Sequence, residues 1–211
     1  MQEDNKRTFW STLKAEWYPS LRELRFSGSG KHFIRVRDSL VDCVALQTRS
    51  DGSSCCVNLG LHPRGLPAPF GGGVVEAKMK VVDCEFKRRL APEGQVDHWW
   101  PFGNTQSEAA SAARDLAALF ASRGEPCFRK YESIRDLVGD ATPDDISKGT
   151  VPLFADFPIT ALRAALLLAQ LRKSQGDVEA AHAFAQFGLD QTTAVKGAAL
   201  RGYFKELLKS S

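Results

Sequence analysis

The sequence predicts an α+β fold, in which an N-terminal helix packs on an antiparallel sheet of about four strands and a helical C-terminal region follows. Three observations predict this fold. An apolar stripe at helical spacing opens the chain, short alternating runs separated by turn residues come next, and the second half is rich in alanine and leucine at helical spacing. The composition agrees, because 43% hydrophobic and 25% charged residues in a chain of 211 are typical of a globular protein.

The first predicted element is a helix over residues 6–24. Four large apolar residues recur at every fourth position and therefore share one face of this helix: Phe9, Leu13, Trp17 and Leu21. We expect this face, including its tryptophan, to pack in the core. Pro19 lies within the stripe and has no backbone N–H, so we expect the helix to end or restart there.

Strand-like runs occupy residues 32–37, 40–48, 55–61 and 75–86. The first three are joined by short turns, and a parallel crossover needs about a dozen residues or more, so these neighbours are predicted to be antiparallel. A loop rich in proline and glycine, residues 62–73, separates the third run from the fourth. The runs therefore predict a four-stranded antiparallel meander.

The second half of the chain is predicted to be helical. Its helical segments cover residues 107–123, 128–138, 159–174, 178–187 and 193–208. Gly124 and Gly188 are placed where a helix would stop. We expect an α+β domain over residues 1–140 and a helical extension over residues 141–211. The hairpin in this extension resembles a tetratricopeptide unit, but arrays of such units need about three copies, which favours a packed extension.

The net charge of +3 argues against a nucleic-acid partner, because dedicated nucleic-acid binders carry a large basic excess. The charge is unevenly spread, at +5 over residues 1–90 and −2 over residues 91–211. No apolar signal core follows Lys6–Arg7, and the most apolar run, residues 161–171, is shorter than the roughly 20 residues of a membrane span. The sequence therefore predicts a soluble, cytoplasmic protein without a membrane partner.

No motif for catalysis, metal binding or cofactor binding is visible. The four histidines form no metal-ligand pair, and no nucleophile signature is present. The glycines at residues 71–73 lack the Lys-Ser/Thr pair and the helix that a phosphate-binding loop needs. The five cysteines are an odd number without a C-x-x-C motif, which predicts small buried residues rather than a disulfide framework. We therefore expect no catalytic residue, no metal and no cofactor.

The most distinctive stretch is residues 84–102, where a cationic strand end is followed by a tryptophan pair. Tryptophan and arginine are enriched in the energetic centres of protein interfaces. On this basis we predict a partner-binding surface made of Arg88, Arg89, Asp97, Trp99 and Trp100. The alternative interpretation is that one tryptophan closes the end of the sheet while the arginines are solvated or pair with acidic residues.

Several of these stretches carry a family resemblance: Phe9-Trp10-x-x-Leu13-Lys14, Phe33-x-Arg35, the run from Val41 to Gln47, Val57-Asn58-Leu59-Gly60, Arg88-Arg89-Leu90 and Trp99-Trp100. Over residues 5–140 the chain resembles a bacterial family catalogued as a domain of unknown function. Members are small α+β domains, some of them encoded near polymorphic-toxin genes. The resemblance transfers no catalytic residue. It implies an immunity protein that binds a cognate toxin and occludes its active site.

Two other functions remain open from the sequence. One is an enzyme whose composite site is invisible in a single sequence, which a polar pocket lined by histidine and carboxylates would favour. The other is a cytoplasmic adaptor that docks a partner on its helical hairpin, which an exposed apolar groove between residues 159 and 208 would favour.

Overall fold

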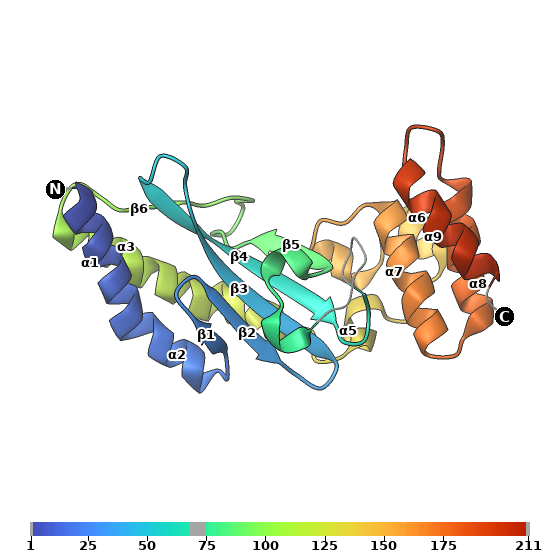
Figure 1. Cartoon of the computed structure of the whole chain (residues 1–211), viewed down its shortest axis with the longest axis horizontal. Helices are drawn as coiled ribbons and strands as arrows, with labels where there is room; N and C mark the ends of the chain where they lie inside the picture. Colours follow the sequence, from blue (N-terminus) through green and yellow to red (C-terminus); the bar gives the residue numbers. More distant parts are fainter. Residues whose placement is uncertain (1, 68–74, 210–211) are drawn as a thin grey trace. The chain divides into compact units, whose positions relative to one another are not determined.

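The protein consists of two compact units, Met1–Glu132 and Ser133–Ser211, in a computed structural model that describes residues 2–67 and 75–209 (Figure 1). The first unit is the α+β unit and the second is helical, which confirms the predicted fold class. The short helix α5 (Ile134–Val138) falls in the second unit. None of the helices in the described ranges has the length and apolar composition of a membrane span.

The first helix continues through Pro19 rather than ending there. Helix α1 (Gln2–Thr12) runs into a π-helical turn (Leu13–Trp17) and then into α2 (Tyr18–Glu23). The wider π turn, which the N–H of Tyr18 closes on the carbonyl of Leu13, directly precedes the proline and accommodates a residue that an unbroken α-helix would reject. The apolar stripe that the sequence predicts is buried along this whole helix.

The sheet is antiparallel throughout and follows the order β1-β2-β3-β4-β5, with β6 paired to the free end of β4. Its strands are β1 (Ser27–Ser29), β2 (His32–Val36), β3 (Leu40–Thr48), β4 (Ser54–Pro63), β5 (Phe86–Arg89) and β6 (Trp100–Pro101). The predicted meander is confirmed for β2, β3 and β4. Residues 27–29 add a short edge strand that pairs with β2.

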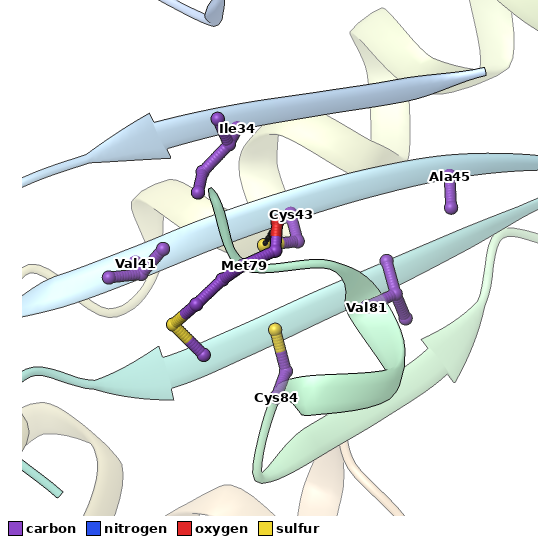
Figure 2. Packing of buried hydrophobic residues seen from close by; sticks show 7 residues of the cluster. All are labelled: Ile34, Val41, Cys43, Ala45, Met79, Val81 and Cys84. Atoms are coloured by element: carbon purple, nitrogen blue, oxygen red, sulfur yellow. Dashed lines mark hydrogen bonds between the residues drawn. The ribbon is translucent and has the colours of Figure 1, made fainter. Parts of the chain in front are cut away.

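The predicted long strand over residues 75–86 is wrong. Two 3₁₀ turns, Glu76–Lys78 and Val81–Asp83, replace it, and only residues 86–89 join the sheet. This segment lies across the sheet and buries Met79, Val81 and Cys84 against strands β2 and β3 (Figure 2). The alternation of apolar and polar residues over 75–86 therefore comes from a segment that packs one side on the sheet. Periodicity alone cannot distinguish such a segment from a strand.

The register gives the sheet two faces. The inner face carries Phe33, Val44 and Leu59, and the outer face carries His32, Ala45 and Asn58. Helices cover the inner face, because the ring of Trp17 lies 6.0 Å from that of Phe33. The outer face is covered only in part, by residues 79–84.

A second π turn shapes the other helix on the inner face. Helix α3 (Gln106–Leu119), which lies beside α1 (Figure 1), continues through a π turn (Phe120–Gly124) into α4 (Glu125–Arg129), so the predicted stop at Gly124 is wrong. A Cβ atom on Gly124 would lie 2.6 Å from the ring of Phe120, so this glycine permits close packing. As in the first helix, a proline, Pro126, follows the π turn.

The second unit is built mainly from α7 (Ala161–Ser174), α8 (Val178–Asp190) and α9 (Ala198–Lys209), preceded by α5 and α6 (Pro143–Lys148). The three long predicted helices are thus confirmed. Gly188 does not stop α8, which runs on to Asp190. It lies under the ring of Phe204 from α9, where a Cβ atom would be only 2.2 Å from the ring carbons.

Candidate functional site

The five predicted partner-binding residues do not form one surface. Because side chains alternate along β5, Arg88 lies on the inner face and Arg89 on the outer face. An Nη atom of Arg88 lies 3.9 Å from the sulfur of Cys127 on α4. Trp100 pairs with Cys55 in the sheet and is only 3% exposed, so it closes the end of the core. Arg88 and Trp100 are therefore separated from the other three residues by the thickness of the sheet.

The other three residues meet on the outer face and form what we call the Arg89–Asp97–Trp99 cluster. An Nη atom of Arg89 donates to one carboxylate oxygen of Asp97 at 2.9 Å, and the indole N–H of Trp99 donates to the other at 3.1 Å. The Arg89 guanidinium also lies 4.9 Å from the centre of a Trp99 ring. The three side chains therefore hold one another in a fixed arrangement.

The cluster is accessible and charged. The side chain of Arg89 is 24% exposed and that of Asp97 is 50% exposed. Desolvation acts to raise the pKa of Asp97, but hydrogen bonds from Arg89 and Trp99 outweigh it and hold the pKa below its ordinary value. Arg49 approaches the Trp99 ring from the neighbouring hairpin, with 5.9 Å from its guanidinium carbon to the ring centre. A rigid aromatic flanked by cations can serve as an anchor for a partner.

A second feature of the outer face is a hollow of about 460 Å³, which we call the basic hollow. Its rim carries Lys31, His32, Lys80 and Lys87, and its floor includes Ala45 and Val81. Desolvation and the charges of Lys80 and Lys31 lower the pKa of His32. This site could not be predicted from the sequence, because its cations come from three separate segments. The only available signal was the alternation that places Lys87 and Arg89 on one face of β5.

A buried ion-pair cluster lies on the inner face. Asp42 is fully buried and accepts from Arg35 Nε at 2.7 Å and from an Nη of Arg37 at 2.6 Å. Arg35 also donates to Glu125 of α4 at 2.9 Å, and it stacks 4.4 Å from the ring centre of Phe26. Burial raises the pKa of Asp42 despite its two guanidinium partners. These bonds attach α4 to the middle of the sheet.

The cysteines are unsuited to nucleophilic chemistry. All five are free and buried, as the sequence predicted. Burial raises the pKa of Cys55 to about 12. The side-chain hydrogen bond between Cys84 and Cys43, and then burial, raise the pKa of Cys84 well above its ordinary value, so few thiolates form at these two residues at neutral pH. Across residues 2–67 and 75–209, no group of three or more histidine, cysteine or acidic side chains is arranged to hold a metal ion.

Comparison with known proteins places the chain in a family. Residues 17–130 match the sequence model of a family described as "Domain of unknown function (DUF4304)". The matched range contains the whole sheet, the second π turn, the buried ion-pair cluster and both outer-face features. The chain matches no curated protein and no solved structure.

Proposed function

The chain belongs to the DUF4304 family of domains of unknown function, and we propose from its surface that it is a non-enzymatic binding protein. Specifically, we propose an immunity protein that binds a bacterial toxin and occludes its active site. The observation that carries this proposal is the Arg89–Asp97–Trp99 cluster, in which an arginine and a tryptophan are held in place and remain accessible on the outer face of the sheet.

The geometry of the cluster favours binding over chemistry. Both oxygens of Asp97 accept hydrogen bonds from within the cluster, so the carboxylate positions its neighbours and is poorly placed to take a proton from a substrate. Because the side chains are already held in place, little conformational entropy is lost when a partner binds. An immunity protein benefits from this arrangement, since a preformed surface can cover a toxin without rearrangement.

The test uses the protein encoded by the gene next to the one for this chain, which the proposal requires to be a toxin. We expect co-expression of the two to restore growth and the pair to co-purify. Trp99→Ala should weaken binding by about 30-fold, the equivalent of a hot-spot loss of about 2 kcal/mol, measured by calorimetry. Val96→Ala is the matched control, because Val96 lies in the same loop and is 93% exposed.

Two results would contradict the proposal. One is that the wild-type chain neither protects cells nor co-purifies with the neighbouring protein. The other is that Trp99→Ala binds and protects as well as Val96→Ala, which would remove the cluster from the interface. An unchanged unfolding midpoint for both variants shows that each is folded, as expected for side chains outside the core.

An enzymatic function is the second candidate, and one observation favours it. A hollow of about 640 Å³ in the first unit is lined in part by Arg35, Arg37 and Glu125, and the pKa of neighbouring Asp42 is raised by burial. The buried carboxylates already accept from arginines, which leaves them ill suited to act as a general base. For the adaptor alternative, the hollow beside α9 is lined by Lys173, Glu206 and Lys209 together with Tyr203 and Leu207, so it is mixed rather than apolar.

A further inference from the structure

We propose that the basic hollow binds an acidic segment of the protein partner, with carboxylates toward its lysine rim and aliphatic side chains on its floor. This inference rests on the proposed function, because it names the chemistry of the partner that covers the same sheet face. The hollow is a separate feature from the Arg89–Asp97–Trp99 cluster, and none of the sequence motifs pointed to it.

The charge of the hollow is not compensated from within the protein. Among the described residues that line it, none carries a carboxylate. Lys31 donates to the hydroxyl of Thr48 at 2.7 Å, and Lys87 donates to the carbonyl of Val82 at 3.2 Å. Asp83 is the nearest acidic residue in the sequence to Lys80, but it accepts from the backbone N–H of Lys80, at 2.9 Å. The ammonium groups therefore remain available to an incoming anion.

The floor determines which kind of anion fits. It is formed by aliphatic side chains, with Ala45 on β3 and with Val81 and Val82 on the covering segment. No phenylalanine, tyrosine or tryptophan is found among the described residues lining the hollow, whereas proteins that bind single-stranded nucleic acid stack bases on such side chains. An apolar floor with a cationic rim is complementary to a peptide in which acidic and aliphatic residues alternate.

The hollow and the cluster are neighbours on the outer face. Asn58 lines the hollow and is the register partner of Arg89, so the two features occupy adjacent positions on the outer face. Lys87 and Arg89 extend from the same side of β5. A partner anchored on Trp99 would therefore reach the hollow with its neighbouring surface, and the lysines would steer and orient it.

The first experiment measures binding of a short peptide of alternating leucine and glutamate by calorimetry. The comparison ligands are the leucine–glutamine peptide and an oligothymidine. We expect the acidic peptide to bind more tightly than both and to lose affinity as salt is raised. The double variant K80E/K87E should bind it at least about tenfold more weakly. The matched control is K196E/K205E, which makes the same charge change on exposed lysines of the second unit.

The imidazole of His32 reports directly on whether the peptide occupies the basic hollow. Desolvation, and then the charges of Lys80 and Lys31, lower the pKa of His32, so carboxylates bound beside these lysines should raise it. An NMR titration of the His32 imidazole with and without the peptide measures this shift. An unchanged His32 titration, equal loss of affinity in K196E/K205E, or tighter binding of the oligothymidine would each overturn the inference.

The toxin assay separates this inference from the proposed function. If K80E/K87E still binds the toxin like wild type while Trp99→Ala does not, the hollow is not part of the interface but the immunity function stands. If the wild-type chain fails to bind the neighbouring protein and yet the peptide results hold, the proposed function fails and the acidic-segment site stands.

Discussion

Gly188 illustrates how a single residue sets the packing of the second unit. Its pattern in the sequence is that of a helix stop, yet it lies inside α8 against Phe204. Glycine in a helix interior costs roughly 1 kcal/mol relative to alanine, so its presence there needs a compensating gain. The close approach of α9 supplies that gain, because Phe204 is fully buried.

We expect Gly188→Ala to destabilise the protein by about 1–3 kcal/mol, because the new methyl group must displace the Phe204 ring. Gly202→Ala is the matched control, since a Cβ atom on this helical glycine meets nothing within 4 Å. The control should be neutral or stabilising by up to about 1 kcal/mol. Urea unfolding followed by far-UV circular dichroism measures both. A Gly188→Ala variant as stable as Gly202→Ala would show that α8 and α9 are not packed so closely.

Arg25 is the other residue whose backbone is unusual. It is the only residue other than glycine with a positive φ, of 66°, among those the structure describes. Arg25 follows the end of α2, where the backbone N–H of Phe26 donates to the carbonyl of Leu21. This bond is typical of the Schellman motif, in which the residue at the position of Arg25 is usually glycine. The end of α2 therefore depends on tertiary packing of Phe26 more than on local preference.

At the scale of elements, the segment over residues 75–84 has the clearest consequences. This segment covers part of the outer face of the sheet. Its close approach to β4 depends on Gly60. A Cβ atom on Gly60 would lie 2.7 Å from the sulfur of Cys84 and 3.1 Å from the Cα of Val81. The segment also leaves part of the face open, and that opening is where the basic hollow lies.

We expect Gly60→Ala to cost about 1–3 kcal/mol of unfolding free energy, because the segment must move away from the sheet. Cys84→Ala removes the sulfur that the new methyl group would meet, so the double variant should be less destabilised than the sum of the single variants by at least about 0.5 kcal/mol. Denaturant unfolding of the four proteins measures this coupling. Gly60→Ala combined with Cys55→Ala is the control, because distant sites should be additive. Additivity of Gly60 and Cys84 would contradict the packing described here.

The net charge of the whole molecule is distributed unequally between its two units. The first unit, residues 1–132, has 19 basic and 16 acidic residues and so carries the entire net charge of +3, while the second unit has nine of each. All four tryptophans also lie in the first unit. Each unit has buried aromatic residues of its own, such as Trp17 in the first and Phe184 in the second. Binding by the proposed surfaces therefore needs only the first unit.

We expect residues 1–132 expressed alone to fold cooperatively, because the sheet and its covering helices form one core. Tryptophan fluorescence on urea unfolding should show a single transition with buried indoles in the native state. The leucine–glutamate peptide should bind this fragment with the affinity of the full chain. Fluorescence typical of exposed tryptophan in the absence of urea would show that the first unit depends on the second.

Much of the fold was determined by sequence periodicity. The stripe from Phe9 to Leu21 and the alternation in β2 to β4 each specify one face, because a residue spacing close to 3.6 or 2 must bury its apolar side. The long helices of the second unit follow for the same reason. The resemblance to a family of α+β domains of unknown function is likewise confirmed at that level by the match over residues 17–130.

Tertiary structure decided the rest, because those features depend on contacts between distant residues. Only packing distinguishes residues 75–84 as a cover for the sheet rather than a strand, and only packing turns Gly124 and Gly188 from helix stops into points of close approach. Tertiary structure also decided which residues of the candidate site lie together. Neighbours in sequence such as Arg88 and Arg89 were separated by the strand pleat. Lys31, Lys80 and Lys87 come from the turn before β2, from the covering segment and from β5, and tertiary packing brought them together at one hollow.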